Sequence, residues 1–182
     1  DACIATVQGR LHENTFDVSF NVTDIETIFH NAGSIPLPPY INRQTEELDI
    51  DRYQTVYSQN TGSVAAPTAG LHFNELMLEQ LRHHGISIAN VTLHVGPGTF
   101  RPVKAETIDQ HDMHEERYIL SKQAADLINN TRAKGGRIIA IGTTSVRVLE
   151  TCATDEGTVE AQSGRTKLFM HPPYIPKVTD GL

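Results

Sequence analysis

Three prolines within four residues separate two parts of the chain that have different patterns. Pro36, Pro38 and Pro39 fix φ and lack backbone donors, so the stretch around them fits neither a helix interior nor the centre of a sheet. Such a stretch is typical of a domain boundary. We therefore predict one domain over residues 1–34 and a second over residues 35–182.

The part before the prolines predicts a β-hairpin followed by a short helix. Apolar and polar residues alternate in two runs within residues 3–22, and the polar residues 12–15 supply the turn. Thr23 and Glu26 then form a capping-box pattern, and Gly33 stands where a helix C-cap belongs. The first domain is therefore expected to hold a hairpin and one helix.

After the prolines, helix-like and strand-like segments alternate along the chain. The predicted helices are one that carries Tyr53, Val56 and Tyr57 and three more at residues 74–84, 121–134 and about 145–152. The predicted strands are residues 86–95, 137–141 and about 167–170. Alternation of this kind indicates an α/β fold.

Composition excludes several classes of protein. With 38% hydrophobic residues, 13 glycines and a mean hydropathy of −0.31, the chain is neither disordered nor collagen-like, and no apolar run reaches the roughly 20 residues that span a bilayer. Cys3 and Cys152 are too far apart in sequence to indicate a disulfide framework or a cysteine zinc site. We predict a reduced, cytoplasmic protein without a membrane partner. Its net charge of −7 means that any binding of nucleic acid must rely on local contacts and shape.

Two glycine-containing loops are candidates for ligand contact. In residues 93–103, Gly96 and Gly98 flank a proline directly after a predicted strand, so the backbone could cradle an anion or a nucleoside, and His94 lies at the carboxyl end of that strand. A simple glycine turn explains this segment equally well. Residues 64–73 are rich in small side chains and place His72 just before a helix, although a tight connector with a packed histidine also fits.

Residues 111–116, HDMHEE, combine imidazoles with carboxylates. On a helix, His111 and His114 would share a face and could hold a metal, provided that His94 or His72 supplied a further ligand. Without a metal, a histidine beside a carboxylate is a standard acid–base pair, because imidazole titrates near neutrality. Both interpretations stay open from the residues alone.

Residues 142–150, GTTSVRVLE, lead from a predicted strand into a helix. Free N–H groups at the helix start and the hydroxyls of Thr143, Thr144 and Ser145 predict a site for a carboxylate or phosphate. Arg147 and Glu150 lie three residues apart, and the simplest interpretation of that pair is a surface ion pair. We expect this loop and the two glycine loops to converge on one pocket.

Six segments in a fixed order carry a resemblance to a known family. They read PLPPYINR, RYQTVYS, VAAPTAGLHF, TLHVGPGTFRPV, HDMHEE and IAIGTTSVRVLE. Together they resemble the S-adenosylmethionine:tRNA ribosyltransferase-isomerase family of queuosine biosynthesis. The resemblance implies a large α/β barrel domain with a smaller all-β domain inserted in it, so residues 1–34 would be the end of the insertion and residues 35–182 part of the barrel.

The resemblance also implies a reaction. The ribosyl portion of S-adenosylmethionine, which serves as a substrate, would move onto 7-aminomethyl-7-deazaguanine at the wobble position of a tRNA with a queuosine-type anticodon, giving epoxyqueuosine and releasing adenine and methionine. No metal is expected. Family chains extend beyond both ends of this sequence, so we expect a molecule of these residues alone to be inactive.

Roles can be carried onto the matching residues of this chain. His94 and His114 are candidates for proton transfer, with Glu115 orienting an imidazole. The residues expected to bind substrate are Thr68, Gly70, His72, Gly96, Gly98, Thr99, Phe100, Thr143, Thr144, Ser145 and Arg147. A metal-dependent hydrolase using His94, His111 and His114 is the alternative function.

Overall fold

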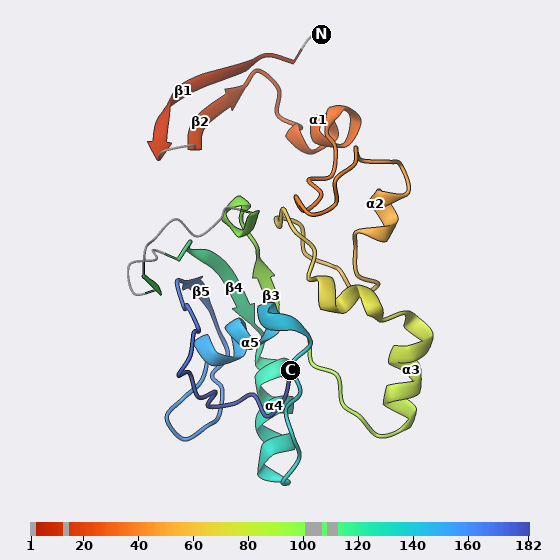
Figure 1. Cartoon of the computed structure of the whole chain (residues 1–182), viewed down its shortest axis with the longest axis vertical. Helices are drawn as coiled ribbons and strands as arrows, with labels where there is room; N and C mark the ends of the chain where they lie inside the picture. Colours follow the sequence, from red (N-terminus) through yellow and green to blue (C-terminus); the bar gives the residue numbers. More distant parts are fainter. Residues whose placement is uncertain (1–2, 13–14, 101–106, 109–112) are drawn as a thin grey trace. The chain divides into compact units, whose positions relative to one another are not determined.

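The structure is a computed structural model that describes residues 3–12, 15–100, 107–108 and 113–182. The chain divides into two compact units, Asp1–Pro36 and Leu37–Leu182. Figure 1 shows the elements of each unit in the order in which they occur along the chain. No helix among the described residues combines the length and the apolar content that crossing a membrane requires.

The first unit contains the predicted hairpin and helix. Strands β1 (Ala5–His12) and β2 (Thr15–Phe20) pair antiparallel, with Val7 opposite Val18. Helix α1 (Ile25–Ala32) follows and packs on the hairpin through an edge-to-face contact between Phe20 and Phe29.

The caps of α1 agree in part with the sequence pattern. The expected N-cap was Thr23, but the carboxylate of Asp24 caps the helix by accepting the backbone N–H of Thr27 at 3.0 Å. The Asp24 carboxylate bonds the N–H three residues along, as a Thr23 cap would have bonded that of Glu26, and its charge also favours the positive end of the helix. Gly33 is the C-cap, as predicted, and its N–H donates to the carbonyl of Phe29.

Two long helices of the second unit occur where the sequence predicts them. Asn74 caps α3 (Glu75–His83) by accepting the N–H of Met77, and Ser121 caps α4 (Lys122–Ala133) by accepting the N–H of Ala124. Both caps are local side-chain contacts, so the sequence predicts these boundaries well. A short 3-10 helix, η1 (Thr68–His72), precedes α3.

The prediction of a helix around Tyr53 and Tyr57 is wrong. Helix α2 (Asp49–Arg52) has a single turn, and Tyr53 is its C-cap. Beyond it, the Tyr57 hydroxyl packs against Gly70, a tertiary contact that local periodicity does not contain. The helix expected at about 145–152 is present as α5, but it begins three residues earlier and spans Gly142–Thr151.

An antiparallel three-stranded sheet lies beside α5. Strands β3 (Thr92–His94), β4 (Glu116–Leu120) and β5 (Gln162–Thr166) pair in that order, and Figure 1 shows α5 against them. The strand predicted over 86–95 is reduced to β3, because only these residues pair with β4. The last strand is β5 and not residues 167–170. The residues of β5 are polar and mostly exposed, so the sequence shows no apolar alternation that would predict a strand there.

Residues 137–141 form no strand, contrary to prediction. They make one isolated parallel bridge, between Ile139 and Gly181. The N–H of Ala140 donates to the carbonyl of Gly181 at 2.8 Å, and the N–H of Asp180 donates to Ile138 at the same distance. An apolar run becomes a strand only where a partner continues the ladder, and this one has a partner for only a few residues.

The core of the second unit lies between β4, α4 and α5. Its largest part is Tyr118, Leu120, Ala124, Ala125, Ile128, Val146, Val148, Leu149 and Cys152. The predicted α/β class is therefore confirmed. Within the described ranges, however, the strands form two small antiparallel sheets and no closed barrel, because the larger sheet ends at β3 and β5.

Candidate functional site

His94 lies at the end of β3, where a neighbouring segment holds the backbone. The N–H of Val95 donates to Ser63 Oγ at 3.2 Å, and the N–H of Val64 donates to the carbonyl of Val95 at 2.9 Å. The half-buried imidazole packs on Gly62, where an added Cβ would come within 2.8 Å of Nδ1. Gly62 also has a φ of +124°, so both its conformation and its close contact favour glycine.

The imidazole of His114 packs against the turn that follows β3. This turn is the 3-10 helix η2 (Pro97–Phe100). A Cβ added at Gly98 would lie 2.0 Å from Cδ2 of His114, whereas one added at Gly96 would meet nothing within 4 Å. Gly98 therefore makes room for a side chain of the protein, and the structure brings η2 and His114 together.

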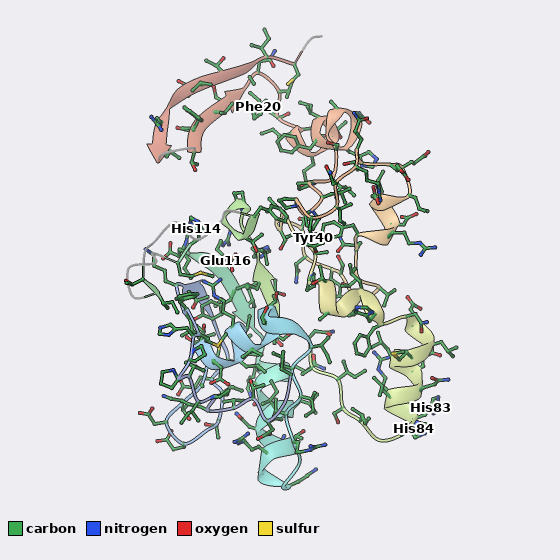
Figure 2. The ribbon with its side chains drawn as sticks, in the orientation of Figure 1. Phe20, Tyr40, His83, His84, His114 and Glu116 are labelled. Carbon is green, nitrogen blue, oxygen red and sulfur yellow. The ribbon has the colours of Figure 1, made fainter. Side chains whose placement is uncertain are left out.

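A buried carboxylate joins these two segments. Glu116, at the start of β4, accepts the N–H of Gly96 through Oε1 at 3.1 Å. Its Oε2 accepts from Nη1 of Arg147 on α5. Figure 2 shows Glu116 and His114 at the beginning of β4. The carboxylate thus links the loop after β3 to the helix that carries the hydroxyl-rich segment.

Arg147 completes this network with two backbone carbonyls. Its Nη2 donates to His114 at 3.0 Å and to Thr166 at 3.1 Å. The side chains of Arg147 and Glu116 are only 7% and 6% exposed, and Nε of Arg147 has no hydrogen-bond partner within the described part of the chain. Burial lowers the pKa of the Arg147 guanidinium, and the Glu116 carboxylate opposes that shift. We call Gly96, His114, Glu116, Arg147 and Thr166 the Glu116–Arg147 network.

The simplest interpretation of Arg147 and Glu150, a surface ion pair, is wrong. Both side chains are buried. Glu150 accepts backbone N–H groups of Lys177, Val178 and Thr179 at 2.7 to 3.2 Å. The two side chains of this helix therefore hold different parts of the protein: Arg147 holds the candidate site and Glu150 holds the segment near the end of the chain.

The start of α5 differs from the sequence prediction in one respect. Because the helix begins at Gly142, the residues Thr143, Thr144 and Ser145 lie inside its first turn rather than before it. Ser145 Oγ donates to the carbonyl of Ile141 at 2.9 Å, and the N-cap Ile141 offers no side-chain oxygen. The first N–H groups of the helix are therefore left without a side-chain cap, which suits an anion.

The segment around η1 lies next to the start of α5. A Cβ added at Gly142 would approach Cβ of Ala69 to 3.1 Å. Gly70 is buried under Tyr57, whose hydroxyl oxygen would be 2.0 Å from a Cβ at that position. Burial raises the pKa of Tyr57. Thr68 and His72 are exposed at the two ends of η1.

The remaining predicted site residues are found on the surface or outside the described ranges. Glu115 and Thr99 are exposed and Phe100 is half-buried. Glu115 Oε2 accepts from Arg165 on β5 at 3.1 Å. His111 lies outside the described residues, so the predicted metal pair does too. Where residues 113–116 are described they are not helical, because β4 begins at Glu116.

Two further observations concern ligands. In the described part of the chain no three His, Cys, Asp or Glu side chains are grouped to hold a metal. A mostly apolar groove of about 590 Å³ separates residues 85–91 from residues 137–141, and of the predicted site residues that are described only Ser145 lines it. His94 and His114 are not among the lining residues, so this groove is not the predicted meeting point of the imidazoles.

Sequence reasoning missed Glu116 as a site residue. The motif HDMHEE is interpreted through its histidines, and Glu115 rather than Glu116 is assigned to orient an imidazole. The available signal was the alternation from residue 116 to 120, in which Glu116, Tyr118 and Leu120 share one parity and are buried. A carboxylate on the inward parity of a strand requires a buried partner, and that partner is Arg147.

The fold and the network define a mixed α/β protein whose candidate site is assembled from loops around a small sheet and the start of a helix. A family model described as "Queuosine biosynthesis protein" matches residues 2–182, and the chain belongs to that family. This finding confirms the resemblance seen in the six sequence segments.

Curated relatives support the same assignment. Two of them, each named S-adenosylmethionine:tRNA ribosyltransferase-isomerase, come from Trichlorobacter lovleyi and a Thermoanaerobacter species. The first is 47% identical over 179 residues, which is 98% of this chain and 52% of the relative; the second is 53% identical over 157 residues, 86% of this chain and 46% of the relative. The chain thus spans about half the length of the curated relatives it matches.

A solved structure is also similar. It is a crystal structure of an S-adenosylmethionine tRNA ribosyltransferase from Thermotoga maritima, 29% identical to this chain, with a TM-score of 0.47. The match covers 98% of this chain and 44% of the solved chain.

Proposed function

We propose that the full-length protein containing this chain transfers and isomerises the ribosyl moiety of S-adenosylmethionine onto 7-aminomethyl-7-deazaguanine at the tRNA wobble position. The products would be epoxyqueuosine in the tRNA, adenine and methionine. The observation that carries this proposal is that three separate family-like segments share the buried Glu116–Arg147 network. Family membership supports the choice of reaction.

The proposal extends to the architecture of the full-length protein. Residues 1–34 would be the end of an inserted all-β domain, and residues 35–182 part of an α/β barrel that further chain completes. The exposed apolar side chains of Ile86 and Ile139, beside segments that lack a full strand partner, suit such an incomplete sheet.

His94 and His114 are assigned to proton transfer. The sulfonium of S-adenosylmethionine acidifies the neighbouring carbon, so a positioned imidazole can take that proton and leave an ylide. The carbon–nitrogen bond to adenine must also break, and a second imidazole can protonate the departing base. Each imidazole packs on a glycine backbone, His94 on Gly62 and His114 on Gly98, which restricts its orientation.

The start of α5 is assigned to an anionic group of the substrate, for which the methionine carboxylate is the natural candidate. The uncapped N–H groups of the first turn and the hydroxyls of Thr143 and Thr144 are suited to a carboxylate. Both terminal nitrogens of Arg147 are already bonded within the protein, so we assign Arg147 to the network instead. The remaining substrate contacts are assigned to Thr68, His72, Gly96, Thr99, Phe100 and Ser145, whereas Gly70 is buried under Tyr57 and is assigned none.

The test uses the full-length protein, tRNA that carries the aminomethyl-deazaguanine base, and S-adenosylmethionine labelled in its adenine. Free labelled adenine should accumulate with the modified tRNA and not with tRNA that has guanine at the wobble position. His94→Ala should lower turnover far more than it weakens binding of S-adenosylmethionine. Absence of adenine release from the unmodified protein would overturn the proposal.

A second experiment, in which the protein is treated with a chelator, tests the alternative function of a metal-dependent hydrolase using His94, His111 and His114. Under the proposed reaction, dialysis against a chelator leaves adenine release unchanged, since no step is assigned to a metal. Loss of activity that zinc or manganese restores, and that His111→Ala mimics, would favour the hydrolase.

A further inference from the structure

We propose that Glu116 is a positioning residue, whose carboxylate holds the turn at Gly96–Phe100 and the His114 imidazole in one arrangement with the start of α5. The proposal rests on the proposed function, because it gives that arrangement a purpose in the reaction. Glu116 itself touches neither imidazole in the described contacts and acts through Gly96 and Arg147.

The two carboxylate oxygens act on two different elements. Oε1 accepts the N–H of Gly96, the residue immediately before η2, so it sets where that turn leaves β3. Oε2 accepts from Arg147 on α5. A bond between a carboxylate and a charged donor is directional and shorter than a neutral one, so it transmits position accurately between the elements.

His114 is held by both ends of this arrangement. Its backbone carbonyl accepts from Nη2 of Arg147 at 3.0 Å, and its ring lies on Gly98, two residues after the Gly96 N–H that Glu116 holds. If the Gly96 turn moved away, the ring would lose the surface against which it packs. The place of the imidazole therefore depends on Glu116 although no bond joins the two side chains.

The network also sets the distance from the imidazole to the proposed anion site. Arg147 lies about one helical turn after Thr143 on the same helix, so fixing Arg147 fixes the start of α5. Burial of both charged side chains excludes water that would otherwise weaken the pair. An exposed ion pair such as Lys122 with Asp126 does not fix the position of one element relative to another.

A purely structural role predicts a different result from a positioning role. Replacing a buried ion pair by apolar side chains of similar volume often preserves stability, whereas removing one partner leaves a buried charge. The informative variant is therefore the double substitution Glu116→Leu with Arg147→Met in the full-length protein. Asp126→Leu with Lys122→Met is the matched control, because it replaces an exposed pair on α4 outside the candidate site.

Three readouts are compared: the unfolding temperature, kcat and KM for adenine release, and the NMR signals of the His114 ring, assigned with His114→Gln. A positioning role predicts an unfolding temperature close to that of the unmodified protein, a shifted His114 signal, and a loss in kcat of about 100-fold, as expected for a displacement of about 1 Å, with little change in KM. Glu116→Asp keeps a negatively charged carboxylate opposite Arg147, so this variant should recover part of that kcat. The control should change none of these quantities.

Two results would overturn the proposal: an unchanged His114 signal in the double variant, or a kcat that falls only in proportion to lost folded protein. If the unmodified protein releases no adenine, the proposed function fails first. The placement of His114 by the Glu116–Arg147 pair is then still decided by the NMR comparison, which needs no turnover. The His114 signal of Glu116→Asp, which leaves Arg147 and its bond to the His114 carbonyl in place, shows the part that depends on Glu116.

Discussion

The His114 imidazole lies directly on the backbone of Gly98, where a Cβ atom would come within 2.0 Å of Cδ2. The position of the His114 ring therefore depends on the absence of a side chain at residue 98. Gly98 makes room for a histidine of the protein, and through this contact the loop after β3 meets the segment before β4.

This contact predicts the effect of Gly98→Ala in the full-length protein. The added methyl group should displace the imidazole and lower kcat for adenine release by about 10- to 100-fold, if His114 transfers a proton. Steady-state kinetics with modified tRNA measures this. Gly9→Ala on β1, where an added Cβ meets nothing within 4 Å, should leave the rate unchanged. Equal rates for Gly98→Ala and the unmodified protein would contradict the assignment of His114.

A second glycine predicts a loss of stability. A Cβ at Gly70 would lie 2.0 Å from the Tyr57 hydroxyl oxygen and 2.9 Å from a methyl carbon of Thr55. Gly70→Ala should lower the free energy of unfolding by about 1–3 kcal/mol, as overpacking usually does. Denaturant unfolding measures the change.

The double variant Gly70→Ala with Tyr57→Phe provides the control. Removing the hydroxyl relieves the closest contact, so the double variant should be more stable than the sum of the two single effects implies. Strict additivity would show that the Tyr57 hydroxyl is not what excludes a side chain at this position.

Glu150 predicts a pH-dependent contribution to stability. Burial by itself would raise the pKa of Glu150, but hydrogen bonds from the backbone N–H groups of Lys177, Thr179 and Val178 outweigh it and lower the pKa below its ordinary value of 4.5. A lowered pKa in the folded state means that the contribution is complete above about pH 4.5 and is lost as the pH falls through the folded-state pKa.

Glu150→Gln tests this contribution. The amide keeps the size of the side chain but replaces one acceptor oxygen by a donor that faces backbone N–H groups, which should cost about 1–3 kcal/mol at neutral pH. Unfolding free energies of both proteins, measured between pH 7 and 3, should converge as the pH falls. A constant difference over that range would contradict the prediction.

The ion pair between Asp49 and Arg43 predicts a lowered pKa for the Asp49 carboxyl. Hydrogen bonds from the Arg43 guanidinium at 2.6 and 2.7 Å, and from the N–H of Glu46, lower the pKa of Asp49 from 3.8 to about 2. Arg43→Met should therefore raise the pKa of Asp49 toward 3.8. Stability that the pair contributes is present above pH 3.8 and is lost between 3.8 and about 2.

NMR titration of the Asp49 carboxyl carbon measures this shift. Arg52→Met is the control, since it removes a cation from the same short helix, and should leave the Asp49 pKa near 2. An Asp49 pKa that is the same in Arg43→Met and in the unmodified protein would show that Arg43 is not the cause.

Elements that depend on neighbouring residues were predictable from the sequence. The hairpin follows from alternation in β1 and β2, and the boundaries of α3 and α4 follow from the caps Asn74 and Ser121, each of which bonds an N–H three residues along. In these cases the physical cause lies within a few residues, so the pattern contains it.

Strands that depend on distant partners were not predictable from the sequence. Residues 162–166 are polar and become β5 only by pairing with β4, while the apolar residues 137–141 have too short a partner to become a strand. Burial decided the role of charged residues in the same way. Arg147 pairs with Glu116, 31 residues away, rather than with Glu150 on its own helix.

The sequence by itself determined the family, the α/β class and the segments that carry chemistry, because these depend on residue types in order and on local periodicity. Only the tertiary structure decided that Glu116 joins those segments and that Gly98 receives the His114 ring. Both facts depend on burial and on contacts between distant parts of the chain. A linear pattern does not contain that information, since it shows which groups are present but not which of them lose contact with water together.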